Sequence, residues 1–314
     1  MIAIVHHADY VAPASADGRR RWNKNGLVRE LLEASGAPIE WIGPEAMPRH
    51  WIEAVHDPVY VEEVASACVP AAKERRIGFG VTETVSRRAF RVPGGTWAAA
   101  LAALDRGFAA NNAGGSHHAL HDSGAGYCVF NDLAIVANRL VAEGRTERVL
   151  IIDLDVHQGD GTAALTAGRP GIATYSIHAE KNFPVRKARS TIDVALPDGA
   201  GDEAYLEALE ASLVPLLERF RPTFLLCQAG VDPFHGDRLG RLALSQAGLD
   251  ARDRFVAALA REWRLPLAAT LGGGYGEDVD EVAARHARTV LNLSAATRSA
   301  KAANFSLGAS GLRD

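Results

Sequence analysis

The sequence predicts one α/β domain, a mostly parallel β-sheet with helices on both faces. Short apolar runs alternate with longer segments rich in Ala, Leu, Glu and Arg, and neither a Pro/Ser-rich nor a Gly/Ser-rich linker interrupts them. No repeat of about 20 to 50 residues is visible. Parallel strands need long, usually helical crossover connections, so this alternation favours a parallel sheet within a single domain.

The expected elements follow from segment length and periodicity. Residues 2–5, 149–154, 172–177, 223–227 and 267–271 are short apolar runs, which is typical of buried strands. Residues 96–110, 131–142, 203–220 and 247–263 are longer and predict helices. The last stretch is small and polar without apolar periodicity, so we expect a folded domain at 1–298 and a flexible tail at 299–314.

Composition and charge exclude several classes of protein. Of the 314 residues, 47% are hydrophobic and 23% are charged, which is typical of a soluble globular protein and not of a disordered or fibrous one. The net charge of -4 provides no overall positive field that would hold nucleic acid or an anionic membrane, although local basic patches are left open.

The cysteines and the N-terminus point to a cellular compartment. Cys68, Cys128 and Cys227 are too few and too widely spaced for a disulfide framework. The chain starts without a basic, apolar leader, and no run approaches the roughly 18 apolar residues of a membrane span. We therefore expect a cytoplasmic protein with neither nucleic acid nor membrane as a direct partner; a homo-oligomer is left open.

The strand expected at 149–154 ends in ligand-type side chains. Asp153, Asp155 and His157 alternate with apolar residues, so the period of two puts them on one face, at the strand end where open α/β sheets hold their sites. A lone Asp or His is more often a helix cap or a satisfied core residue. Two carboxylates crowded beside an imidazole would repel each other, however, and a bound cation would keep them ionised.

A histidine pair is the second chemical signal. His117 and His118 follow Gly114 and Gly115, and adjacent side chains converge only if the backbone bends irregularly, which glycine permits. The pair could supply further metal ligands or be ordinary surface residues. We favour acid–base work on a water molecule at the metal.

Two loops after later strands offer additional groups. The loop after 223–227 contains Asp232, His235 and Asp237, one of which could complete the metal sphere. Three glycines at 272–274 precede Tyr275 and let the backbone pass close to a ligand while presenting a phenol. By itself the glycine run is weak evidence.

In combination, these segments resemble the histone deacetylase and acetylpolyamine amidohydrolase family, which has an arginase-like fold, over about residues 6–291. The motifs are Gly-Gly-Ser-His-His-Ala at 114–119, Gly-Tyr-Cys-Val-Phe-Asn-Asp at 126–132, Asp-Leu-Asp-Val-His-Gln-Gly-Asp-Gly at 153–161, Gly-Asp-Arg-Leu-Gly at 236–240 and Gly-Gly-Gly-Tyr at 272–275. The compact length and the stretches at 178–184 and 192–199 are most similar to class IV-like bacterial members.

The resemblance implies two metal sites. Asp155, His157 and Asp237 would bind a catalytic Zn²⁺, with Asp237 chosen by its place in the Gly-Asp-Arg-Leu-Gly motif and not by spacing. Two carboxylates and one imidazole can also hold Fe²⁺ or Mn²⁺. A structural K⁺ is expected at Asp153, Asp155, His157, Ser176 and Ile177, largely through carbonyl oxygens.

The resemblance also implies catalytic roles. His118 matches the general base, and His117 matches its electrostatic or acid partner for the leaving amine. Asp153 would orient His117 and Asp160 would orient His118, each fixing a tautomer. Tyr275 matches the phenol that donates to the carbonyl oxygen and stabilises the oxyanion.

The expected substrate-binding residues form a channel. Tyr127 and Phe183 match aromatic walls around an acyl-lysine stem, with the backbone of Gly126 beside them; without the motif they would be read as core residues. Gly273 completes the expected binding set together with Leu244, which stands where polyamine enzymes commonly carry an acidic gatekeeper. An apolar residue there favours lysine or longer acyl chains.

The sequence thus predicts a zinc-dependent amidohydrolase that removes acetyl or longer acyl groups from the ε-amine of lysine. Two alternatives are kept: hydrolysis of an acetylpolyamine or another small acylated amine, and a non-catalytic acyl-lysine-binding module. The histidine pair and Tyr275 disfavour the binding module, because a pure binder needs neither a base nor an oxyanion donor.

Overall fold

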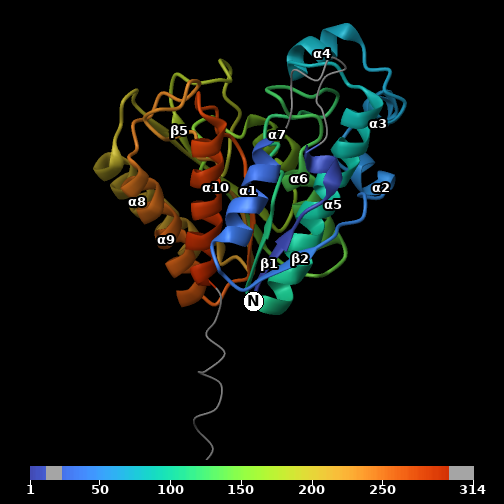
Figure 1. The fold of residues 1–314 in the computed structure, drawn as a ribbon. Helices are drawn as coiled ribbons and strands as arrows, with labels where there is room; N and C mark the ends of the chain where they lie inside the picture. The colour runs from blue at the N-terminus through green and yellow to red at the C-terminus, as the bar shows by residue number, and fades with distance from the viewer. Residues whose placement is uncertain (12–22, 297–314) are drawn as a thin grey trace, which may run out of the picture.

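The computed structural model describes residues 1–11 and 23–296, which form one parallel sheet of eight strands flanked by helices (Figure 1). The strand order is β2-β1-β3-β8-β7-β4-β5-β6, and all neighbouring strands run parallel. The strands are β1 (Ile2–Val5), β2 (Ile39–Ile42), β3 (Phe108–Asn111), β4 (Val149–Asp153), β5 (Ile172–Ala179), β6 (Ile192–Leu196), β7 (Phe224–Gln228) and β8 (Leu267–Thr270).

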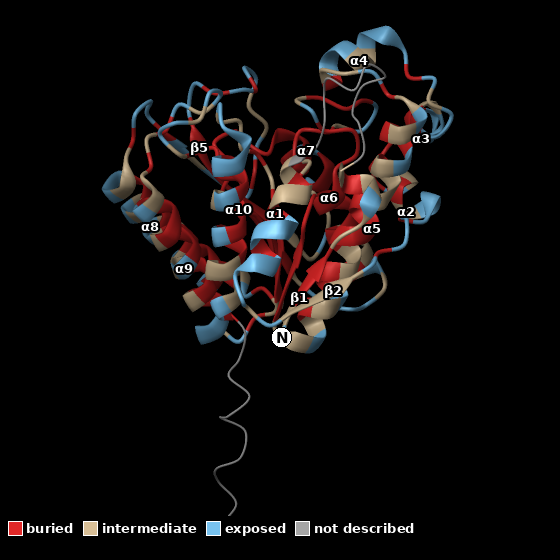
Figure 2. Ribbon diagram, viewed as in Figure 1, coloured by how far each residue is buried: buried red, intermediate tan, exposed pale blue. Residues whose placement is uncertain are grey.

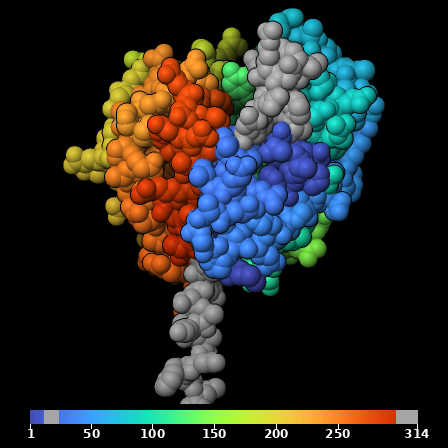
Figure 3. Space-filling view, in the orientation of Figure 1, coloured from blue at the N-terminus to red at the C-terminus, as the bar shows by residue number. Residues whose placement is uncertain are grey.

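Helices cover both faces of this sheet. The α-helices are α1 (Asn23–Ala34), α2 (Arg49–Glu53), α3 (Pro58–Ala65), α4 (Ala71–Ile77), α5 (Glu83–Arg106), α6 (Asp132–Ala142), α7 (Asp160–Thr166), α8 (Asp202–Phe220), α9 (Gln246–Glu262) and α10 (Val279–Leu293), and two 3₁₀ turns span Ala8–Val11 and Ser294–Ala296. Core residues of α1, α8, α9 and α10 belong to one cluster, and those of α2, α3, α5, α6 and α7 belong to a second. Helices α1 and α10 lie side by side at the surface (Figure 3).

The period of two explains the two cores. Along β4, Leu150 and Ile152 pack into the first cluster, whereas Val149 and Ile151 pack into the second. Every residue of β4 is buried, and its first four residues are apolar, as expected for a parallel strand covered on both faces. Buried segments lie between the outer helices of the molecule (Figure 2).

The predicted fold class is confirmed, and the five predicted strands correspond to β1, β4, β5, β7 and β8. The prediction of a helix over residues 96–110 was wrong at both ends. Its helix, α5, begins at Glu83 and ends at Arg106, and residues 108–111 form strand β3 instead. Gly107, with φ 89°, ends the helix and allows the chain to turn into the strand.

Other sequence expectations meet the structure in part. All three cysteines are free: Cys68 is exposed, and Cys128 and Cys227 are buried. In the described part of the chain no helix is long and apolar enough to cross a membrane. The tail expected at 299–314 lies outside the described residues.

Parallel pairing brings the carboxyl ends of all the strands to one edge of the sheet. The segments that follow β3, β4, β7 and β8 begin at this edge, and these four strands include the central pairs β3–β8, β8–β7 and β7–β4. The motifs found in the sequence lie on these segments, so the topology brings together side chains more than 100 residues apart.

Candidate active site

Three side chains of the site, Asp153, Asp155 and His157, come from the end of β4 and the residues directly after it. Asp153 is the last residue of the strand, and Asp155 and His157 follow it; all three are buried. The backbone N–H of His157 donates to Oδ1 of Asp155 at 3.1 Å, and Nδ1 of its imidazole lies 3.0 Å from the same oxygen. The chain therefore curls after the strand so that the two side chains face each other.

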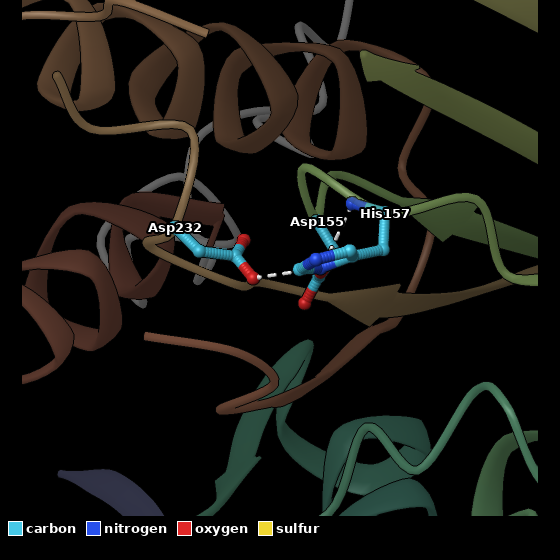
Figure 4. A group of neighbouring side chains, drawn as sticks. All are labelled: Asp155, His157 and Asp232. Carbon is cyan, nitrogen blue, oxygen red and sulfur yellow. Dashed lines mark hydrogen bonds and ion pairs between the residues drawn. The ribbon is translucent and has the colours of Figure 1, made fainter. Parts of the chain in front are cut away.

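Asp232, from the segment after β7, completes a cluster of three (Figure 4). One ligand atom from each of Asp155, His157 and Asp232 lies within 4.8 Å of the other two. Oδ1 of Asp232 accepts a hydrogen bond from the backbone N–H of Val156 at 2.9 Å, and Oδ2 lies 3.3 Å from Nδ1 of His157. Among the described residues Oδ2 of Asp232 has no hydrogen-bond partner, although it is fully buried.

The structure corrects the sequence's choice of Asp237 as the third ligand. Oδ1 of Asp237 accepts from the backbone N–H groups of Leu239 and Gly240, at 2.8 and 3.0 Å, and Oδ2 accepts from the backbone N–H of Tyr275 at 2.6 Å. Both oxygens of the Asp237 carboxylate are therefore occupied by hydrogen bonds from loop backbone N–H groups. Asp232 follows β7 more closely and stands beside the end of the neighbouring strand β4, so it takes the place beside His157.

The carboxylate of Asp155 is held from its other side. Its Oδ2 accepts from Nε2 of Gln228 at 2.6 Å and from the backbone N–H of Gly273 at 2.9 Å. Sequence reasoning missed Gln228, although a polar residue ending an apolar strand was a usable signal. Gln228 is the direct partner of Asp153 in the register between β4 and β7.

Burial and charge set the protonation of this cluster. Burial and the nearby Asp155 charge raise the pKa of Asp232 to about 7. Burial acts in the same direction on Asp155, but the charge of His117 and the hydrogen bond from His157 outweigh it and hold the pKa of Asp155 well below its usual range. Two buried carboxylates that face one imidazole fit a divalent metal ion, which would bind Oδ2 of Asp232 and keep both carboxylates charged.

The two adjacent histidines lie against this cluster. Nδ1 of His117 is 2.7 Å from Oδ2 of Asp153, and Nδ1 of His118 is 2.6 Å from Oδ1 of Asp160. The ring centroids of the histidines are 4.0 Å apart, so both face the same space. The glycines at 114 and 115 have φ of 83° and 80°, which provides the bend that the sequence suggested.

The same environment separates the pKa values of the pair. Burial lowers the pKa of His117, but the charges of Asp153 and Asp155 outweigh this and raise it to about 9. For His118, burial and the neighbouring His117 charge together lower the pKa to about 4, despite the hydrogen bond to Asp160. One imidazole is therefore charged and the other is neutral near neutral pH.

Asp132, the first residue of α6, holds the backbone before the histidines. Its carboxylate accepts from the backbone N–H groups of Gly115 and Ser116, at 3.1 and 2.8 Å, and from the hydroxyl of Thr96 at 2.6 Å. The sequence motif included Asp132, but the residue was given no role. Its buried carboxylate fixes the loop that carries both imidazoles.

The aromatic residues stand around the outer side of the site. Tyr127 and Phe183 are 49% and 45% exposed, and Phe183 packs edge-on against His118 with ring centroids 4.7 Å apart. The ring of Tyr275 lies 5.9 Å from that of Tyr127 and 6.4 Å from that of His157. At Gly126 (φ 51°) a Cβ atom would stand 2.5 Å from the His118 ring, so the close approach needs glycine.

Two cavities meet at these residues. The outer cavity, of about 660 Å³, opens from His118, His157 and Tyr275 past Tyr127 and Phe183. A second cavity, of about 730 Å³ and also open to the surface, is called the inner cavity because His117 and Asp155 line it; Gly273 and Tyr275 line it too, and it extends to Val282 on α10 and Lys24 on α1. Both cavities are lined by Gly126, Tyr127, Arg238 and Tyr275.

Lys24 is a site residue that no sequence signal pointed to. Its Nζ donates to the backbone oxygen of Gly272 at 3.0 Å. Burial lowers the pKa of its ammonium to about 8, although the carboxylates of Asp232 and Asp155 oppose the shift.

Comparison with known proteins identifies the family. A family model described as the histone deacetylase domain matches residues 20–291. The chain belongs to the histone deacetylase family. It is therefore one of a family of amidohydrolases, enzymes that act on amide bonds.

Relatives of this deacetylase-family chain occur in bacteria and plants. An uncharacterized protein of Picosynechococcus sp. is 40% identical over 285 residues, which covers 90% of this chain and 95% of the relative. Histone deacetylase 2 of Arabidopsis thaliana is 35% identical over 58% of this chain and 48% of its own length. A histone deacetylase-like amidohydrolase of Pseudomonas aeruginosa is 32% identical over 51% of this chain and 46% of its own length.

Solved structures share the deacetylase fold. The crystal structure of the HDA15 HD domain has a TM-score of 0.77 at 21% identity and covers 95% of this chain and 90% of that one. The acetylpolyamine aminohydrolase from Burkholderia pseudomallei has a TM-score of 0.75 at 22% identity and covers 94% of this chain and 99% of that one. At these identities the comparison shows the fold.

Leu244 and the Ser176–Ile177 segment were also expected at the deacetylase site. Leu244 was expected at the channel mouth, but it is fully buried in the apolar core; its backbone N–H donates to Pro233 and its carbonyl accepts from His235, so the prediction was wrong. Ser176 pairs with Asp153 in the register between β4 and β5, and Ile177 is the next residue of β5. The potassium site assigned to them stays a prediction.

Proposed function

We propose that this chain is a metal-dependent deacylase that hydrolyses the amide between an acyl group and the ε-amine of lysine. The observation that carries the proposal is the packing of two carboxylate-bound imidazoles against the buried Asp155–His157–Asp232 cluster, where two cavities meet at Tyr275. Burying a group of this composition costs free energy unless a cation binds to it. Strongly shifted pKa values in such a group are typical of active sites.

Asp155, His157 and Asp232 would hold the metal ion. When bound, a divalent ion at this place would polarise the acyl carbonyl and increase the acidity of water. Zn²⁺ is the ion we expect, while the carboxylate-rich ligand set also suits Fe²⁺ or Mn²⁺. Gln228 and the backbone N–H of Gly273 hold Asp155, which supports a fixed ligand geometry.

The histidines divide the proton transfers. Nδ1 of His118 faces Asp160, which leaves Nε2 of the neutral ring free to take a proton from the attacking water. His117, charged and bound to Asp153, stands beside it to stabilise the developing charge and to protonate the leaving amine. The phenol of Tyr275 keeps its proton, since burial raises its pKa, and can donate to the oxyanion.

The two cavities suit the two ends of the substrate. The outer cavity, with Tyr127 and Phe183 as walls and Gly126 between them, would admit the lysine stem. The inner cavity, of about 730 Å³, would receive the acyl group, and it is larger than an acetyl group requires. We therefore propose that acyl chains longer than acetyl are accepted.

A panel of lysine peptides tests the proposal. Zinc-loaded protein is assayed on acetyl, butyryl, decanoyl and myristoyl lysine in one peptide sequence, with and without a chelator. We expect chelator-sensitive turnover, with at least one longer chain cleaved as well as acetyl. A fully metallated protein that cleaves no acylated amine contradicts the proposed function, and cleavage of acetyl alone contradicts the assignment of the inner cavity.

We also propose that K⁺ binds beneath β4, near Asp153 and Ser176, as the family resemblance implies. Replacing NaCl by KCl at equal ionic strength should then raise the melting temperature, because a ligand that binds only the folded state stabilises it. Equal melting temperatures in the two salts contradict this site.

A further inference from the structure

The outer cavity has a basic rim. Five cationic side chains line it: Arg75 and Arg76 in the last turn of α4, Lys181 after β5, and Arg238 and Arg241 after β7. All five are exposed, and α4 lies at the outer surface of the molecule (Figure 2). Three segments far apart in the sequence thus place positive charge around one opening.

Most cations of this basic rim form no ion pair with a carboxylate of the described residues. No Asp or Glu among the described residues lines the outer cavity, and the only ion pair that the rim forms there joins Arg241 to Asp198 at 3.0 Å. Glu74 and Asp237 keep their negative charge, but they make these hydrogen bonds with the backbone and not with the rim cations: Glu74 accepts from Val81, and Asp237 holds its own loop and the loop of Tyr275.

The basic rim differs in sign from the chain as a whole. The net charge is -4, so these cations form a local patch and not part of a general positive surface. Charges of one sign around a concave opening focus the field and attract ligands of the opposite sign. A positive field at the opening repels a polyamine, which carries further ammonium groups next to the amide to be cleaved.

We propose that the basic rim selects acylated lysines whose flanking residues are acidic, a substrate class that rests on the deacylase function proposed above. When the lysine stem enters between Tyr127 and Phe183, the peptide backbone stays at the opening. An extended chain advances about 3.3 Å per residue, so the two or three residues on each side of the lysine lie over the rim. Carboxylates at these positions would lie near Arg75, Arg76, Lys181 and Arg238. These are the four rim cations that form no ion pair with a described carboxylate.

Matched peptides test the selection on the full, zinc-loaded chain. Three acyl-lysine peptides differ only in their flanks, which are Asp and Glu, Asn and Gln, or Lys and Arg. We expect kcat/KM to fall by about tenfold from acidic to amide flanks and again to basic flanks, since several exposed pairs add modestly. The change should lie in KM, because the rim acts alike on the bound substrate and the transition state.

Neutralising part of the basic rim tests its residues. In Arg75→Gln/Arg76→Gln, glutamine keeps the helix propensity of α4, and we expect the ratio of kcat/KM between acidic and amide flanks to fall several-fold. The matched control is Arg254→Gln, an exposed arginine of α9 that lines neither cavity, and it should leave this ratio unchanged. Unchanged melting temperatures show that the variants fold.

The outcomes separate this inference from the proposed function. Equal kcat/KM for all flanks, a preference for basic flanks, or better cleavage of acetylspermidine than of the acidic peptide overturns the selection while the deacylase function stands. A loss of preference in Arg254→Gln equal to that in the double variant overturns the role of the basic rim. Failure to cleave any of these substrates contradicts the deacylase function itself.

Discussion

Two regions of the molecule differ in charge and in exposure: the proposed metal site is rich in buried carboxylates, and the opening of the outer cavity is rich in exposed cations. At the inner end, Asp153, Asp155 and Asp232 are buried and packed against histidines. At the opening, the basic rim is exposed to water and mostly without carboxylate partners. Buried charges are costly unless fully paired, whereas exposed charges cost little and contribute little. We therefore expect large losses of activity from changes to the inner groups and small shifts of substrate preference from changes at the opening.

The largest effect is expected from removing the third inner carboxylate. Asp232→Asn should lower metal affinity by more than about 100-fold and abolish turnover, because changing an outer-shell partner alone typically costs 10- to 100-fold. Zinc retained after dialysis, measured by mass spectrometry, reports this directly. In Asp237→Asn the metal should stay bound, since Asp237 holds only backbone groups. The reverse result would restore Asp237 as the ligand.

Removal of the neutral imidazole comes next. His118→Ala should reduce kcat by about 10²- to 10⁴-fold, the usual contribution of a positioned base, and leave zinc bound. The two measurements are kcat on the acetyl-lysine peptide and zinc content. Zinc lost together with activity would identify His118 as a ligand and not as a base.

The phenol should contribute somewhat less. Tyr275→Phe should lower kcat by about 10²- to 10³-fold with little change in KM, because the hydroxyl acts on charge that develops in the transition state. Steady-state kinetics on the same peptide measure both constants. A pure increase in KM would show that the phenol only binds substrate.

The pH profile sharpens the contrast within the histidine pair. Because the pKa of His118 is lowered from 6.5 to about 4, its ring is neutral and able to accept a proton well below neutral pH. We expect kcat/KM to show no acid limb near pH 6.5. A half-loss of kcat/KM near that pH, with zinc still bound, would show that the base titrates as an exposed histidine does.

Ionic strength should produce the smallest effect, confined to the opening. Raising salt from about 0.01 to 1 M shortens the Debye length from about 30 to 3 Å, which screens exposed charges and leaves buried ones nearly unaffected. KM for an acid-flanked peptide should rise several-fold while kcat stays constant. An equal rise for the peptide with amide flanks would show that salt acts elsewhere.

Buried strands could be predicted from the sequence, and half-exposed ones could not. Strands β4 and β7 are wholly buried, and each begins with four consecutive apolar residues. Strands β2 and β6 form the two edges of the sheet, carry Glu40 and Asp193, and lie partly exposed, so their apolar signal is diluted. Strand β3 follows an Ala-rich helix after a single glycine, and its own two alanines extended the helical pattern.

Site residues near the end of a strand could also be predicted from the sequence, and those on irregular loops could not. Asp153, Asp155 and His157 were found because they alternate with apolar residues at the end of a buried run, although β4 ends at Asp153 and the chain curls after it to bring Asp155 and His157 together. The choice between Asp232 and Asp237 depended on the course of an irregular loop, which has no periodicity to follow. Leu244 was misplaced for the same reason. The basic rim is distributed over three loops, and no local pattern in the sequence assembles it.

One short segment performs two tasks. Asp232 faces the metal cluster, and five residues later Asp237 grips the backbone N–H of Tyr275. In the proposed roles, this one stretch positions both the metal ligand Asp232 and the hydroxyl donor Tyr275, so displacing it would disturb both. Local unfolding of this stretch would therefore abolish the proposed metal site and the proposed oxyanion donor together.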